Sequence, residues 1–104
     1  MTRPELSVGR GVIVEMARLA ALEVPDVLRV ARSGPAWRAA LIGGPVRVRL
    51  RGDVVSIRLW LVARPGADLQ ATAARVRSAV GAAVERLLGL RLGSVSVIVD
   101  GVGG

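Results

Sequence analysis

The clearest pattern in the chain is the alternation of valine or leucine with arginine from Val46 to Arg51, which resumes in the segment Val54 to Ala63 after a break at Gly52-Asp53. A period of two predicts β-strands, and a two-residue break that begins with glycine is typical of a tight hairpin turn. If the turn closes at Gly52-Asp53, one face has three apolar pairs, as a correct register requires: Leu50 with Val55, Val48 with Ile57, and Val46 with Leu59. The polar face then has three opposed pairs: Arg51 with Val54, Arg49 with Ser56, and Arg47 with Arg58.

Two longer segments have apolar residues three and four positions apart, which predicts amphipathic helices. The first covers Arg10 to Val24 and is ended by Pro25, because proline cannot continue a helix. The second covers Leu69 to Leu88. Asp68 is a good N-cap for it, and Gly89 is a typical residue at the C-terminal end of a helix.

Two further strands complete the predicted order of elements. Glu5–Val8 is a short first strand, and Ser94–Asp100 is a last strand with alternating valines. The order β-α-β-β-α-β predicts an α+β fold: a two-layer sandwich in which both helices cover one face of a small mixed sheet. All 104 residues form one domain, with an irregular loop over 26–45 and flexible ends at 1–4 and 101–104.

The amino-acid composition excludes several kinds of catalytic and metal-binding site. The chain has fifteen arginines, no lysine, a net charge of +7, and no histidine or cysteine. It therefore has no thiolate nucleophile, imidazole base, Schiff-base lysine or usual zinc ligand set. We expect no enzyme and no catalytic, cofactor-binding or metal-binding residues. The preference for arginine over lysine indicates a GC-rich genome, whereas the net positive charge favours anionic partners.

No targeting segment is predicted. The first ten residues contain no apolar run of signal-peptide length, and no uncharged stretch approaches the ~20 residues needed to cross a bilayer. We expect a cytoplasmic protein, with any membrane association being peripheral.

Four segments together resemble the bacterial alkaline shock protein twenty-three family. They are a helix end at Leu19–Val27, a break at Pro65–Leu69, a second helix end at Ala83–Leu90, and a closing strand at Val95–Val102. The resemblance implies a non-enzymatic envelope stress response protein that forms assemblies. It also implies a location beneath the cytoplasmic membrane, held there by a small membrane-anchored relative. The basic charge, Pro65 and the short tail depart from the family pattern.

The polar face of the hairpin is the predicted partner-binding site. Its residues are Arg47, Arg49, Arg51, Arg58 and Trp60. Arg47 opposite Arg58 is a like-charge pair, which is unfavourable unless something compensates, and arginine with tryptophan is typical of binding surfaces. The alternative is an ordinary solvated face.

The functional hypothesis is a membrane-periphery interaction protein in the envelope stress response. It binds a protein partner or an anionic surface through this face and forms a homo-oligomer, with no small-molecule substrate. The alternative hypothesis is a small RNA-binding module with a KH-like outline, although the GxxG clamp of KH domains is absent.

Overall fold

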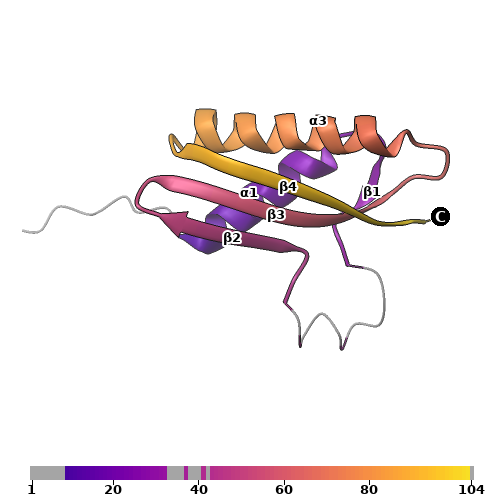
Figure 1. Ribbon diagram of the computed structural model, residues 1–104, viewed down its shortest axis with the longest axis horizontal. Helices are drawn as coiled ribbons and strands as arrows, with labels where there is room; N and C mark the ends of the chain where they lie inside the picture. Colours follow the sequence, from indigo (N-terminus) through magenta and orange to yellow (C-terminus); the bar gives the residue numbers. More distant parts are fainter. Residues whose placement is uncertain (1–8, 33–36, 38–40, 42, 104) are drawn as a thin grey trace, which may run out of the picture.

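The computed structural model describes residues 9–32, 37, 41 and 43–103 (Figure 1). Within these ranges the order of elements is α-β-β-β-α-β. The elements are α1 (Arg10–Leu22), β1 (Val27–Arg29), β2 (Val46–Arg51), β3 (Val54–Ala63), α3 (Leu69–Ala82), the π-helical turn η1 (Ala83–Leu87) and β4 (Arg91–Val102).

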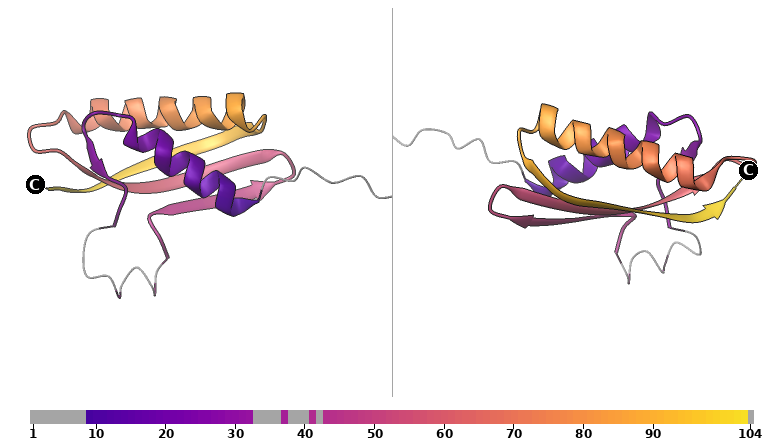
Figure 2. Two further views of the ribbon diagram at one scale, coloured as in Figure 1. Left: turned by 180° about the vertical axis from the view of Figure 1, so that it is seen from behind. Right: turned by 45° about the horizontal axis from the view of Figure 1, so that its top comes forward.

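The four strands form one mixed sheet with β3 in the centre. The strands β2 and β1 both pair with β3 in antiparallel orientation, and β4 pairs with β3 in parallel orientation. The helices α1 and α3 lie on the same face of this sheet, and the other face is open (Figure 2). The predicted α+β class, the two layers and the mixed sheet are confirmed.

The hairpin has the predicted register. The three polar pairs and the three apolar pairs between β2 and β3 are those derived from the alternation. Gly52 adopts a φ of +59°, a left-handed conformation that glycine reaches without strain, so the chain can turn within two residues. The apolar face of β3 is buried against the helices, whereas Arg47, Arg49 and Arg58 are exposed on the open face.

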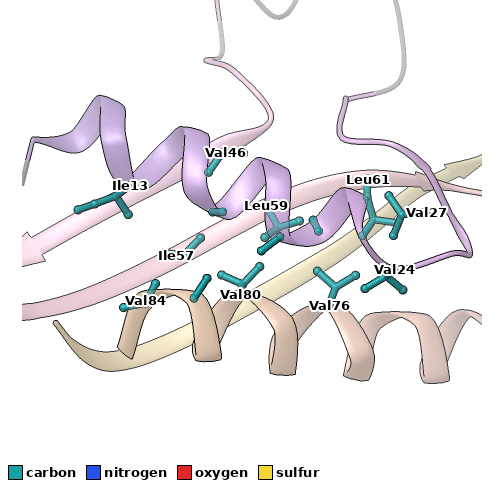
Figure 3. Close-up of a cluster of buried hydrophobic side chains, with 14 of the residues drawn as sticks. Ile13, Val24, Val27, Val46, Ile57, Leu59, Leu61, Val76, Val80 and Val84 are labelled. Atoms are coloured by element: carbon teal, nitrogen blue, oxygen red, sulfur yellow. The ribbon is translucent and has the colours of Figure 1, made fainter. Parts of the chain in front are cut away.

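The hydrophobic core lies between the sheet and the two helices (Figure 3). Its largest fully buried side chains come from α1, β3 and α3, and η1 adds one more. They are Ile13, Val55, Ile57, Leu59, Leu61, Val76, Val80 and Val84. Removal of this apolar surface from water is the main force that holds the helices on the sheet.

The second predicted helix is present, and Asp68 is its N-cap. The Asp68 carboxylate accepts a hydrogen bond from the backbone N–H of Ala71 at 3.1 Å. The buried Thr72 hydroxyl donates to the Asp68 carbonyl at 2.8 Å, so this polar side chain is satisfied inside the core. The last turn is π-helical, and Gly89 follows it with a φ of +66°.

Three predictions about the boundaries need correction. Strand β1 lies in the segment 26–45 that was predicted to be irregular. With only three residues it has no periodicity of its own; it forms because Val27 is buried and pairs with Ala63. The end at 101–104 was predicted to be flexible, but β4 continues to Val102, and the Gly103 N–H donates to the Ala63 carbonyl at 3.0 Å.

The last strand also begins earlier than predicted, at Arg91. The β3–β4 register shifts by one residue between Leu92 and Ser94, so Gly93 is an extra residue there and interrupts the alternation. The predicted strand Glu5–Val8 and the predicted flexible end 1–4 lie outside the described residues. No helix in the described ranges is long and apolar enough to span a membrane.

Candidate binding site on the open face of the sheet

The open face of the sheet has a shallow hollow of about 370 Å³. Its polar lining comes from three strands: Arg47 and Arg49 on β2, Ser56, Arg58 and Trp60 on β3, and Ser94 and Ser96 on β4. We call this set of seven residues the arginine face. Strand alternation brings these side chains together, because every second residue of each strand points away from the helices.

Four of the five predicted site residues meet at this hollow. Arg47, Arg49, Arg58 and Trp60 all line it. Arg51 does not, because it lies at the end of β2 next to the turn, where it pairs with Val54 and is exposed. The structure therefore gathers a smaller set than the one predicted from the alternation.

The like-charge pair Arg47–Arg58 is present in the register. The Arg47 guanidinium packs against the backbone of Gly43: a Cβ placed on Gly43 would lie 3.1 Å from Arg47 Nη1. Gly43 has a φ of +96°, so the chain bends there in a conformation that L side chains rarely adopt. A side chain at this position would push Arg47 from its place.

Trp60 has an arginine partner that the sequence did not indicate. The guanidinium carbon of Arg32 lies 3.6 Å from the centroid of the Trp60 ring, which is a stacked cation–π contact. Arg32 Nε also donates to the Gly44 carbonyl at 3.3 Å. Arg32 thus fixes the chain next to the open face. Close by, the backbone N–H of Trp60 donates to the Pro45 carbonyl at 2.8 Å.

Arg32 could not be found from the sequence, because it lies in the segment predicted to be irregular. The only available signal was that the chain has fifteen arginines and two tryptophans, and this signal does not say which of them meet.

The hollow has many hydrogen-bond donors and no carboxylate in its lining. Arginine guanidinium groups, serine hydroxyls and the indole N–H are the donors. Guanidinium groups donate paired hydrogen bonds to carboxylate and phosphate oxygens. The arrangement therefore suits an anionic oxygen ligand, and its lining has no carboxylate that could act as a base for the serine hydroxyls.

The usual ligands of a zinc ion are missing from this chain. Histidine and cysteine are absent from the sequence, and the described residues contain no group of three or more carboxylates that could hold a cation. On α1, away from the arginine face, the Arg18 side chain hydrogen-bonds to Glu15 and lowers the pKa of that carboxyl.

Comparison with solved structures places the fold in the ferredoxin-like class. The similar structures are of the C-terminal domain of MamM, a cation diffusion facilitator. The zinc form of one variant has a TM-score of 0.59 at 20% identity, over 90% of this chain and 87% of that one. A doubly substituted variant has a TM-score of 0.58 at 22% identity, over 90% and 95% of the two chains. A manganese form has a TM-score of 0.57 at 22% identity, over 89% and 99%.

At this identity the likeness shows a shared fold. No protein-family model and no curated protein matches the sequence.

The predicted membership of the alkaline shock family is wrong, because the structural neighbours are MamM domains. The envelope stress role and the RNA-binding alternative are overturned with it. The segments behind the resemblance are helix ends, a break and a closing strand. These features are common in α+β domains in which a helix connects two strands of one sheet. They therefore do not distinguish one family with this arrangement from another.

Proposed function

We propose that the chain is a non-catalytic interaction domain that binds an acidic segment of a protein partner on the arginine face. One observation carries the proposal: Arg47, Arg49 and Arg58 converge with Trp60 on a single open hollow whose lining contains no carboxylate. Arginine and tryptophan are enriched at the centres of protein interfaces, where a few residues supply most of the binding free energy.

The shape of the hollow supports a peptide rather than an enclosed small molecule. Small-molecule sites are concave, mostly apolar and bury most of their ligand. This hollow is shallow, and its lining is dominated by guanidinium and hydroxyl groups on the open face of the sheet. An extended acidic segment can lie across such a surface with its carboxylates on the arginines while its backbone stays in water.

The fold neighbours support a regulatory role, whereas the residues of this chain do not favour the binding of a metal. They are regulatory domains of cation transporters rather than enzymes, and some are named as zinc, manganese or copper forms. The chain shares their fold but has neither histidine nor cysteine. A net charge of +7 moreover repels cations. The likeness therefore supports regulation through the binding of a partner, and for this chain we propose an anionic partner in place of a metal ion.

The comparisons are consistent with a homo-oligomer and do not support a membrane-anchored partner or a nucleic acid. A cytoplasmic location close to a membrane is part of this proposal, since the similar domains belong to membrane transporters.

The test uses isothermal titration calorimetry. A ten-residue peptide that alternates glutamate and glycine is titrated into the full chain, and its affinity is measured. The control peptide has glutamine in place of glutamate. Two double variants have the same net charge: Arg49→Glu with Arg58→Glu on the arginine face, and Arg77→Glu with Arg86→Glu on exposed helical positions.

We expect the acidic peptide to bind the original chain and the helical variant. Its affinity should fall at least tenfold with the arginine-face variant, and salt should weaken binding because exposed charges are screened. Equal binding by the two double variants would mean that net charge alone attracts the peptide. Equal binding of the glutamine peptide would show that carboxylates are not recognised. Either result overturns the proposal.

A further inference from the structure

Among the described strands β2 pairs only with β3, so its other side is an edge of the sheet (Figure 1). Two of its arginines, Arg49 and Arg51, are exposed on the open face, and Arg51 lies outside the hollow. Charged residues on an edge strand usually prevent pairing with other strands. This protection depends on the sign of the charge, because cross-strand pairs of like charge are unfavourable and pairs of opposite charge are favourable. An edge of arginines therefore rejects a basic strand and accepts an acidic one.

The backbone groups at this edge can be assigned from the β2–β3 ladder. The Trp60 N–H donates to the Pro45 carbonyl at 2.8 Å, so these two residues face each other with their backbones. In an antiparallel pair, residues whose backbone faces the partner alternate with residues whose backbone faces away. In the register of this hairpin the arginines of β2 therefore direct their backbone groups to β3. The N–H and C=O groups of Val48 and Leu50 point outward, towards the position of a further strand.

The helix side of the same edge is apolar and incompletely covered. Val48 and Leu50 pack against the core but remain partly exposed, whereas their β3 partners, Ile57 and Val55, are buried. A further strand with apolar residues on this side would cover them, and removal of apolar surface from water is favourable. The edge thus fits a strand that is acidic on the open face and apolar on the side of the helices.

We infer that the acidic partner segment binds as an additional β-strand on the edge of β2, in antiparallel orientation, along residues 48–51. Its carboxylates lie opposite Arg49 and Arg51, and its apolar side chains lie opposite Val48 and Leu50. The backbone of the segment then pairs with β2 rather than staying in water, and main-chain hydrogen bonds add to the affinity. This inference rests on the proposed function, because it assigns a binding mode to the same acidic partner.

The antiparallel orientation brings the opposite charges closest together. In this orientation the residues opposite Val48 and Leu50 exchange backbone hydrogen bonds with β2. The residues opposite Arg49 and Arg51 form the intervening pairs, whose Cα atoms are about 4.5 Å apart and whose side chains lie closer. A carboxylate at these positions can accept paired hydrogen bonds from a guanidinium group. Because Arg49 also lines the hollow, one acidic segment can contact the edge and the hollow together.

Other arrangements at the edges of the sheet fit less well. A second copy of β2 would place arginine opposite arginine in every register that keeps the apolar sides together, and such like-charge pairs are unfavourable. The edge of β4 gives an acidic strand little to pair with, because its central positions on the open face are Ser94, Ser96 and Ile98. Charge therefore matches the acidic segment to β2.

The first experiment changes only the peptide, so the protein keeps its original sequence. A seven-residue peptide with four glutamates and three valines in strict alternation is titrated into the full chain by calorimetry. One control peptide has the same composition, with the three valines together in the middle. Two further peptides keep the alternation and have N-methyl groups on the three valines or on three of the glutamates.

In the inferred strand the valine N–H groups face β2 and the glutamate N–H groups face away. We therefore expect the rearranged and the valine-methylated peptides to bind roughly tenfold more weakly than the alternating peptide, and the glutamate-methylated peptide to bind as well as it does. Equal affinities of the four peptides, a loss with the glutamate-methylated peptide instead, or no binding of the alternating peptide would each overturn the inference. The proposed function is judged separately, by its own titration with the glutamate–glycine peptide.

A second experiment identifies the edge that is used. Val54 pairs with Arg51 on β2 and with Arg91 on β4, so these two exposed arginines lie in the same row of the sheet at opposite edges. Arg51→Glu and Arg91→Glu also change the net charge equally. We expect Arg51→Glu to weaken binding of the alternating peptide roughly fivefold and Arg91→Glu to leave it nearly unchanged.

Arg51 separates this inference from the proposed function, because it lies outside the hollow. If Arg51→Glu left the affinity unchanged, or if Arg91→Glu weakened it equally, the strand on β2 would be refuted. The acidic partner on the arginine face would still stand in that case, provided that Arg49→Glu with Arg58→Glu reduced the affinity. Circular dichroism of each variant shows that the fold is kept.

Discussion

Gly93 is the position at which the structure makes its sharpest prediction about stability. A Cβ at this residue would lie 2.7 Å from Ser56 Oγ, 3.0 Å from Val54 Cγ1 and 3.3 Å from the Val55 carbonyl oxygen. The first distance is shorter than any normal contact of a Cβ, and the last involves backbone, which cannot rotate away. Gly93→Ala therefore forces β4 away from β3 where the two strands begin to pair.

The magnitude follows from the cost of overpacking. Forcing an extra carbon into a packed site typically destabilises a protein by about 1–3 kcal/mol. A small domain has a total free energy of unfolding of roughly 5–15 kcal/mol, and about 1 kcal/mol lowers the melting temperature of a domain of this size by roughly 4–8 °C. We therefore expect Gly93→Ala to lower the melting temperature by about 4–24 °C.

The assay is thermal unfolding monitored by circular dichroism, with Gly11→Ala as the matched control. Gly11 is in α1, and nothing lies within 4 Å of the place where its Cβ would be. Alanine is the better helix former, so this control should gain about 0.5–1 kcal/mol. Adding Ser56→Ala to Gly93→Ala removes the closest clashing atom and should recover part of the lost stability.

A Gly93→Ala protein as stable as the original would refute the reasoning, since the strands would then tolerate a side chain at the bulge. An unaltered loss after Ser56→Ala would show that the hydroxyl is not the source of the clash.

Two further predictions concern side chains that pair on the surface. Arg32→Ala, made in a Trp37→Phe background so that only Trp60 fluoresces, should increase acrylamide quenching, because the guanidinium that covers one ring face is lost; unchanged quenching would contradict the stacked contact. The pKa of Glu15 is lowered chiefly by its hydrogen bond with Arg18, so NMR titration should show it rising towards the ordinary value in Arg18→Ala. Since a lowered carboxyl pKa stabilises the fold only while the carboxyl is charged, this contribution is lost as the pH falls through the folded-state pKa, and it is small because the pair is exposed.

The hairpin register could be predicted because local information decides it. The alternation places Val48 and Ile57 on the same face, and a two-residue turn at Gly52-Asp53 places them opposite each other. The structure has this pair. The helices and the position of Asp68 as a cap followed from spacing in the same way. Four of the five predicted binding residues come together for this reason alone: they are alternate residues of two paired strands.

The features that escaped prediction depend on contacts between distant segments. Strand β1 forms because Val27 meets Ala63, and Arg32 lies beside the arginine face because it stacks on Trp60. The extra residue at Gly93 is visible only once β4 lies beside β3. The predicted family was wrong for a related reason, since short similarities at the ends of elements describe a common arrangement and not a particular ancestry.

The parallel pairing of β3 with β4 has a consequence for the rate of folding. The hairpin β2–β3 closes over two residues, but β4 reaches β3 only after the whole of α3 has been passed (Figure 1). Closing a loop of this length costs conformational entropy before the contacts between β3 and β4 can stabilise it. Strand pairs that are distant in sequence therefore form slowly. We expect the hairpin to form early and β4 to dock late, so that refolding is slowed most by substitutions that delay the closing of this crossover.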